Sequence, residues 1–309
     1  MRPEILGYIL LGSVVVIWVS SGFFIQYLFK QSEFDHPVTM TVMSIGLCSL
    51  LLLLPSSSPD PLSDRKASLV SRKKSTLIYM WWLGLIWLAA QLLYNVSLRY
   101  MSVSSNTAIA SSSSLFTFLF SVKFLRGYSF TPTAVAALAC SCAGILLLSS
   151  LENTNAKNNS SFIGFGMALI SCACYGLFTT LLKRFTLSSP VPVTTMFGYF
   201  GVVAILVGTP LIMLSDYTGF DAFALPRTTV AIFGIVANAI IGSVLSDILL
   251  AKAVILLNPV TVSIGLSMSM PLSLLMDSVV VHSSCVLAIL LQFTAVCLIS
   301  IDNHRQGRI

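Results

Sequence analysis

Charged residues are scarce in this chain. Of its 309 residues, 17 are Lys or Arg and 11 are Asp or Glu, so 9% are charged, against roughly 25% in an ordinary soluble domain. Hydrophobic residues make up 56% and the mean hydropathy is +0.92, which is more apolar surface than a soluble interior can hide. This composition excludes a cytosolic enzyme, a disordered tail and a secreted disulfide module, and it indicates an integral membrane protein.

The alternation of polar and apolar residues that marks a membrane β-barrel is also missing. The chain has long uncharged runs instead, such as 5–29, 75–98 and 185–215. Backbone groups in lipid must bond within their own segment, so these runs predict α-helices, each needing about 20 residues to cross the bilayer. The predicted spans are 5–28, 37–54, 77–98, 105–125, 132–151, 162–182, 192–214, 229–252, 259–280 and 283–301.

The two halves of the chain resemble each other weakly at an offset of 156 positions. This offset places 110–113 over 266–269 and Gln91 over Asp247. Each half contains five spans. Because five is an odd number, the second half crosses the membrane in the opposite orientation to the first. We therefore expect an all-α membrane protein of ten transmembrane helices in two inverted five-helix repeats, residues 1–156 and 157–309. Secondary transporters are commonly built this way, with a site near the midplane between the repeats.

Basic residues are distributed unequally between the two sides of these spans. With the N-terminus in the cytoplasm, 13 Lys and Arg residues fall on the cytoplasmic side and 4 on the opposite side. The positive-inside rule therefore predicts that both termini are cytoplasmic. The basic cluster at 65–74 lies in a Ser/Pro-rich loop without interleaved aromatic residues, so no nucleic-acid partner is expected.

Four segments resemble a known group of transporters. WLAAQLLYNVSL (87–98) followed by MSVSSNTAIASSSSLFTF (101–118) is similar to the passage from span 3 to span 4 in the drug/metabolite transporter (EamA-like) superfamily. GSVLSD (242–247) and SMSMPLSLLMD (267–277) resemble its spans 8 and 9. The likeness is nearest to solute-carrier family 35, subfamily F, and related fungal and protist transporters, and it covers nearly the whole chain.

The resemblance implies a carrier of organic metabolites. Its range of substrates includes thiamine-like cations and nucleotide sugars. It favours a vacuolar, Golgi or other endomembrane location over the plasma membrane. The lysine pair that binds phosphate in plastid phosphate translocators is not reproduced here, which disfavours a phosphorylated substrate.

Asp247 is the ionisable residue placed well inside a predicted span, 229–252. A lone charge at the bilayer centre costs about 2.5–3.5 kcal/mol on insertion scales, so it needs a partner or a hydrated cavity. One interpretation is a cation or proton site in a central cavity. The alternative is a pair with Lys252, but five residues along a helix put the two side chains on different faces.

Gln91, Tyr94 and Asn95 occupy positions i, i+3 and i+4 and share one face of the third span. Polar side chains on one face avoid lipid and point toward the bundle interior. They are candidates for substrate contact, and Gln91 corresponds to Asp247 in the repeat. Hydrogen bonding between helices is the alternative role.

Ser113, Ser269 and Tyr175 complete the predicted substrate-binding residues. Ser113 and Ser269 occupy equivalent positions in the fourth and ninth spans, where small residues also serve close helix packing. Tyr175, like Trp18 in the corresponding first span, presents a ring that can stack on a ligand or hold a cation. A packing role is the alternative for both aromatic residues.

No cofactor or metal site is expected. The seven cysteines lie within spans without zinc-ligand spacing, and His36, His282 and His304 lie near span ends or in the tail. There is no HExxH sequence, nucleophile elbow or nucleotide-binding loop, so the chain is not predicted to be an enzyme or an ATP-driven pump.

The sequence therefore predicts secondary-active transport of a small organic solute by alternating access. A cationic metabolite such as a thiamine-like compound is one candidate solute. The first alternative is antiport of a nucleotide sugar or another anionic metabolite, and the second is a non-transporting receptor or structural membrane protein. The expected partners are the solute and the lipid bilayer, with a homodimer possible. The cavity is expected between spans 1, 3, 4, 6, 8 and 9.

Overall fold

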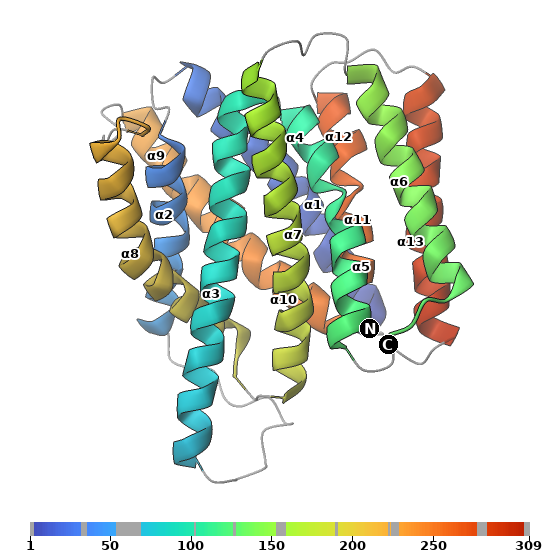
Figure 1. Cartoon of the computed structure of the whole chain (residues 1–309), viewed down its shortest axis with the longest axis horizontal. Helices are drawn as coiled ribbons and strands as arrows, with labels where there is room; N and C mark the ends of the chain where they lie inside the picture. Colours follow the sequence, from blue (N-terminus) through green and yellow to red (C-terminus); the bar gives the residue numbers. More distant parts are fainter. Residues whose placement is uncertain are drawn as a thin grey trace.

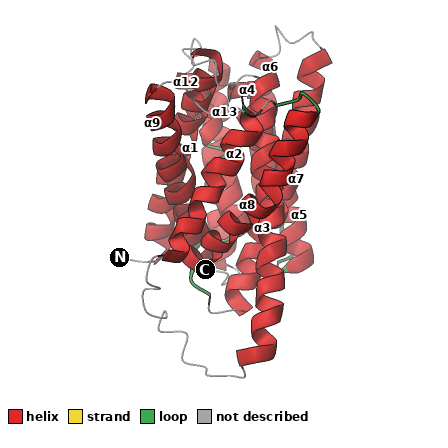
Figure 2. Cartoon of the chain, turned by 90° about the vertical axis from the view of Figure 1, so that its left-hand side faces the viewer, coloured by secondary structure: helices red, strands yellow, loops and turns green. Residues whose placement is uncertain are grey.

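The computed structural model describes residues 3–31, 36–53, 69–101, 103–125, 128–152, 159–188, 191–221, 223, 229–276 and 283–305. Over these residues the chain is helical and contains no strand (Figures 1 and 2). The long helices run side by side along one direction, and both chain ends lie at the same end of the bundle (Figure 1).

The helices follow the predicted spans closely. The first half contains α1 (Pro3–Gln31), α2 (Pro37–Gly46), the 3-10 helix η1 (Leu47–Leu53), α3 (Leu69–Tyr100), α4 (Val103–Ala110), α5 (Ser113–Phe124) and α6 (Pro132–Glu152). The second half contains α7 (Asn159–Ser188), α8 (Val193–Tyr217), α9 (Thr229–Asn238), the π-helix η3 (Ala239–Leu245), α10 (Ser246–Leu256), α11 (Pro259–Leu266), α12 (Ser269–Met276) and α13 (Ser283–Arg305). Residues 54 and 277–280 of the predicted spans lie outside the described residues.

Several helices begin where the sequence supplies a proline. Pro37, Pro132 and Pro259 are the first residues of α2, α6 and α11. Proline suits this position because it has no N–H to leave unpaired and its φ is already helical. These prolines place the helix starts close to the predicted ones.

Four predicted spans are interrupted rather than continuous. The most informative interruptions separate α4 from α5 at residues 111–112 and α11 from α12 at residues 267–268. They lie 156 residues apart, the offset of the predicted repeat, and they touch: the Ser267 hydroxyl donates to the Ser111 carbonyl at 3.3 Å. The remaining two are the change from α2 to η1 and the π-helix η3 between α9 and α10.

Helices from the two halves pack directly on one another. α3 packs on α7, α1 packs on α10, and α6 packs on α13. Glycines on α8 allow close approach to α2 and η1: a Cβ added at Gly208 would lie 2.5 Å from Val42, and one at Gly201 would meet the backbone of Ser49. Small residues at helix interfaces are typical of packing in membranes.

The outside of the bundle is apolar. Leu53, Phe162 and Phe233 are each at least 75% exposed. Among the described residues, Pro3–Tyr27, Ser75–Tyr100, Phe162–Ser188, Val193–Tyr217 and Ile232–Leu256 are apolar and long enough to cross a membrane. An apolar exterior on such helices is suited to lipid, and the chain is a multi-pass membrane protein.

Candidate functional site

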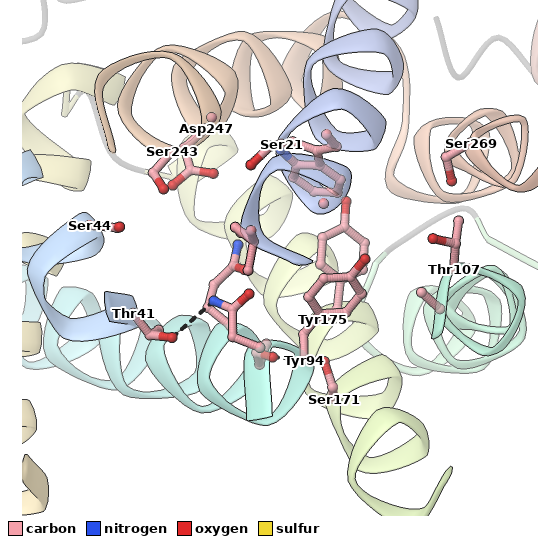
Figure 3. Close-up of a pocket in the computed structure, with 18 of the residues that line it drawn as sticks. Ser21, Thr41, Ser44, Tyr94, Thr107, Ser171, Tyr175, Ser243, Asp247 and Ser269 are labelled. Atoms are coloured by element: carbon pink, nitrogen blue, oxygen red, sulfur yellow. Dashed lines mark hydrogen bonds between the residues drawn. The ribbon is translucent and has the colours of Figure 1, made fainter. Parts of the chain in front are cut away.

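A cavity lies between helices of the two halves (Figure 3). Residues of α1, α2, α3, α4 and α5 line it from the first half, and residues of α7, α9, η3, α10, α11 and α12 line it from the second. Its volume is about 140 Å³, close to that of an engineered cavity of ~150 Å³ that holds benzene. This conformation therefore has room for a group the size of one ring.

All seven predicted substrate-binding residues line this cavity. They are Gln91, Tyr94, Asn95, Ser113, Tyr175, Asp247 and Ser269. They come from five helices in both halves, so the fold brings together positions far apart in the sequence. These residues line the same space, as expected for a shared binding site. Their contact with a solute stays a prediction.

Asp247 lies on α10, two residues after the π-helix η3, and is only 1% exposed. Its Oδ1 atom has no hydrogen-bond partner among the residues that the structure describes. Lys252 is exposed on the same helix, so an internal pair between the two side chains is not formed. A buried carboxylate without a counter-charge is unfavourable unless it takes up a proton or a cation.

The indole of Trp87 lies beside the Asp247 carboxylate. Trp87 is fully buried on α3, and its N–H satisfies no hydrogen-bond geometry in this conformation. An unpaired N–H donor and an unpaired carboxylate oxygen therefore face one another. Buried polar atoms usually have partners, and each of these two groups is the other's nearest candidate partner.

The π-helix η3 shapes the wall that carries Asp247. Asn238, Gly242, Ser243 and Asp247 all face the cavity. A Cβ at Gly242 would lie 2.6 Å from the Asn238 Oδ1 atom and 2.7 Å from the Ser21 hydroxyl, so a larger residue would displace these side chains. The Ser21 hydroxyl donates to Asn238 Oδ1 at 2.6 Å and ties α1 to this wall. Single π-helical turns occur frequently at functional sites.

Trp18 and Tyr175 bring aromatic rings to the cavity lining, and Trp87 packs behind them. Trp18 and Tyr175 meet edge to face with ring centroids 6.1 Å apart, and Trp87 lies 6.3 Å from Tyr175. The Trp18 N–H donates to the Ser246 hydroxyl at 3.0 Å, while the Tyr175 hydroxyl has no partner. Such a ring cluster beside a carboxylate can hold a cation or a flat ring.

The residues of the predicted polar face of α3 have different roles. Asn95 donates to the Thr41 hydroxyl of α2 at 2.9 Å, so its amide makes the interhelical bond that was the alternative interpretation. Gln91 and Tyr94 also line the cavity. In Figure 3 Tyr94 lies between Thr41 and Thr107.

The two ends of the cavity differ in chemistry. Figure 3 shows Asp247, Ser243 and Ser44 on one side and Thr107 and Ser269 on the other. The first side carries the carboxylate together with the Ser44 hydroxyl, which has no hydrogen-bond partner. The second side carries hydroxyls near the interrupted helices. A ligand spanning the cavity would therefore meet a negative end and a neutral polar end.

No Lys, Arg or His is among the described residues that line the cavity. Lys183, a basic residue on the neighbouring part of α7, donates to the Ile255 carbonyl at 2.5 Å and the Leu257 carbonyl at 3.4 Å. Within the described ranges no three His, Cys, Asp or Glu side chains gather as metal ligands. The electrostatic character of the cavity is thus set by Asp247.

Sequence reasoning missed the contribution of the second span. Thr41 and Ser44 of α2 line the cavity, as do Ser21, Ser171 and Ser243. The spans expected around it were 1, 3, 4, 6, 8 and 9, so α2 is an addition. A usable signal was present, because Thr41 and Ser44 are polar residues three positions apart inside an apolar span.

Two hydrophobic clusters of different size pack around the cavity. A large cluster containing Trp87, Phe178, Phe197, Phe200 and Leu250 packs α3, α7, α8 and α10 together. A second, smaller cluster contains Ile25, Met40, Leu98, Val103 and Ile235. Ile25 and Met40 also line the cavity, so the smaller cluster forms part of its wall.

Comparison with known proteins agrees with this architecture. Residues 5–150 match the EamA-like transporter family. The chain is 28% identical to the thiamine-repressible mitochondrial transport protein THI74 of Saccharomyces cerevisiae, over 89% of this chain and 85% of that protein. It is 26% identical to the uncharacterized vacuolar membrane protein YML018C of the same yeast, over 90% of this chain and 84% of that protein.

Two further similarities extend the comparison. Solute carrier family 35 member F5 of Bos taurus is 29% identical over 62% of this chain and 37% of that protein. One solved crystal structure superposes with a TM-score of 0.68 over 97% of this chain and 98% of its own, at 16% identity, which shows a shared fold. Residues 5–150 therefore carry an EamA-like (drug/metabolite transporter) domain, and the chain is similar to fungal transport proteins such as THI74 and, over 62% of its length, to solute carrier family 35 member F5.

Proposed function

We propose that this protein is a secondary-active transporter of a small organic cation, which it binds in the described cavity. The observation that carries the proposal is the unpaired carboxylate of Asp247, buried beside Trp18, Trp87 and Tyr175. A cationic solute supplies the missing charge, and the rings add cation–π attraction. A thiamine-like compound, with a positively charged ring, has the required chemistry.

Alternating access is the proposed mechanism, with two inverted five-helix halves moving against each other around the cavity. Two features support the predicted repeat: the interruptions 156 residues apart, and the packing of α3 on α7 and of α1 on α10, which exchange under that repeat. Interrupted helices at the interface of the repeats are common in transporters of this design.

An anionic solute is the second candidate, because the resemblance to the superfamily also implies nucleotide sugars as solutes. It is the poorer one, since the described lining contains one carboxylate and no basic side chain. We also propose that both termini are cytoplasmic and that the protein resides in a vacuolar, Golgi or other endomembrane. The basic-residue bias supports the orientation.

Uptake by purified protein in proteoliposomes tests the proposal. Labelled thiamine and benzyltrimethylammonium, both permanent cations, are compared with uridine diphosphate glucose and with empty liposomes. We expect saturable uptake of the cations and none of the nucleotide sugar. Uptake of the nucleotide sugar alone would refute the cation assignment, and uptake of none of the three would refute transport of either class.

A further inference from the structure

Among the described residues that line it, the cavity contains one carboxylate and no group that neutralises it. Asp247 is 1% exposed, and its Oδ1 atom has no hydrogen-bond partner. The lining residues that the structure describes include no Lys, Arg or His. The net charge of the site is therefore determined by what Asp247 itself holds.

The groups around Asp247 are polar but neutral. The Tyr175 phenol of α7 and the Cys48 thiol of η1 are the titratable groups that interact with it electrostatically. The indole of Trp87 on α3 lies beside it. Among the described residues of α1, α8 and α11, none places a charge against this carboxylate.

Basic residues on the adjoining helices are directed elsewhere. Lys183 of α7 donates to the carbonyl groups at the end of α10, and Arg184 and Lys252 are exposed. None of them lines the cavity. The carboxylate thus has hydrogen-bond donors within reach, and its charge is not compensated by another side chain.

We propose that Asp247 holds either one proton or one solute cation in each crossing, so that the protein exchanges one proton for one cation without moving net charge. This inference rests on the proposed function and adds the coupling ion to it. With neither ligand, the site would carry a bare charge through the membrane interior. On insertion scales, the cost of this bare charge lowers the population of the unliganded, charged site roughly a hundredfold. With the carboxyl protonated, the site is neutral and has no charge to attract a cation.

The exchange conserves atoms and charge on both sides of the membrane. On one side of the membrane, Asp247–COOH and a cation give Asp247–COO⁻ paired with the cation, and the proton leaves to water. The O–H bond breaks, and its electron pair stays on the carboxylate oxygen. On the other side the cation leaves, and a proton from water bonds to the same oxygen. The Trp87 N–H, which lies beside the carboxylate, is available to donate to it while it is charged.

Coupled flux in proteoliposomes tests the exchange. Thiamine and benzyltrimethylammonium serve as probes, a trapped pH-sensitive dye reports protons, and valinomycin with potassium sets the membrane potential. One-for-one exchange predicts that an inside-acid gradient concentrates the cation about tenfold for each pH unit. Each cation taken up should remove one proton from the interior. Changing the potential at fixed pH gradient should leave the accumulation ratio unchanged.

Variants separate coupling from folding. Asp247→Asn should abolish pH-driven accumulation, whereas Asp247→Glu should retain about tenfold accumulation per pH unit at a reduced rate. Asp216→Asn makes the same chemical change at the far end of α8, away from the cavity, and should behave as wild type. As a check that needs no turnover, cation binding to wild-type protein in weakly buffered detergent solution should release one proton per site.

The outcomes distinguish this inference from the proposed function. If the cations enter but follow the membrane potential instead of the pH gradient, the exchange is refuted and the cation site stands. Tenfold accumulation per pH unit by a correctly folded Asp247→Asn variant would equally refute it. If neither cation binds nor enters, the proposed function and the exchange both fall.

Discussion

Gly242 offers a sharp test of how tightly the cavity wall is built. It lies in the π-helix η3, where an added Cβ would come within 2.6 Å of Asn238 Oδ1 and 2.7 Å of the Ser21 hydroxyl. These two atoms are joined by the 2.6 Å hydrogen bond between α1 and the end of α9. Gly242→Ala therefore forces both partners of that bond to move.

The size of the effect follows from two contributions. Overpacking a filled interior costs about 1–3 kcal/mol, and a hydrogen bond between membrane helices contributes about 0.6 kcal/mol, with a maximum near 1.7. Relative to a glycine-to-alanine change in a helix that meets no neighbour, we expect Gly242→Ala to lower the free energy of unfolding by about 2–4 kcal/mol. Cation uptake should also fall, because the new methyl group narrows the cavity near Asp247.

The matched control is Gly12→Ala on α1, where an added Cβ meets nothing within 4 Å. Alanine is favoured over glycine in a helix by about 0.8–1.0 kcal/mol, so this variant should be as stable as wild type or slightly more so. Equilibrium unfolding in mixed SDS micelles, followed by tryptophan fluorescence, measures both. A Gly242→Ala protein that matches Gly12→Ala in stability and uptake would refute the described packing.

The contact partner can be identified by a double-mutant cycle. Ser21→Ala removes one of the two oxygens that the new methyl group would approach. Combined with Gly242→Ala, it should recover part of the loss, with a coupling energy of about 0.5–3 kcal/mol, whereas non-interacting sites would add within about 0.5 kcal/mol. Strict additivity would place the strain elsewhere.

Three further results are expected. Asp221→Ala should lower stability by about 0.5–2 kcal/mol, as loss of a helix cap does, because its carboxylate accepts from the first turn of α2 at 2.8 Å; unchanged SDS unfolding would contradict this. Gln91→Ala should weaken cation uptake less than Asp247→Asn, since it removes neutral hydrogen bonds rather than a charge, and KM measurements decide the order. In a cysteine-free background on sealed right-side-out membranes, an impermeant maleimide should label Ala156→Cys and miss Gln306→Cys, and the reverse would invert the predicted topology.

The sequence predicted the elements of this fold because membrane helices are specified locally. Each predicted span coincides with one helix or with helices that follow directly on one another. A long uncharged run has to satisfy its own backbone hydrogen bonds in lipid, so composition alone determines the helix. Prolines such as Pro132 and Pro259 then fix where helices begin.

The same local reasoning found much of the cavity. Gln91, Tyr94 and Asn95 share a face by helix geometry, and Asp247 was conspicuous as a charge inside a span. All four line the cavity. Polar residues within an apolar segment avoid lipid, so their position inside the bundle follows from the sequence.

The tertiary structure alone decided which of these side chains meet. That Asn95 bonds to Thr41, that the Trp87 indole faces Asp247 and that α2 contributes to the cavity depend on how separate helices pack. The π-helix η3 before Asp247 and the touching interruptions at Ser111 and Ser267 depend on the same packing. Contacts between helices arise from close packing of distant segments. The periodicity of one helix does not specify which face of which other helix it packs against.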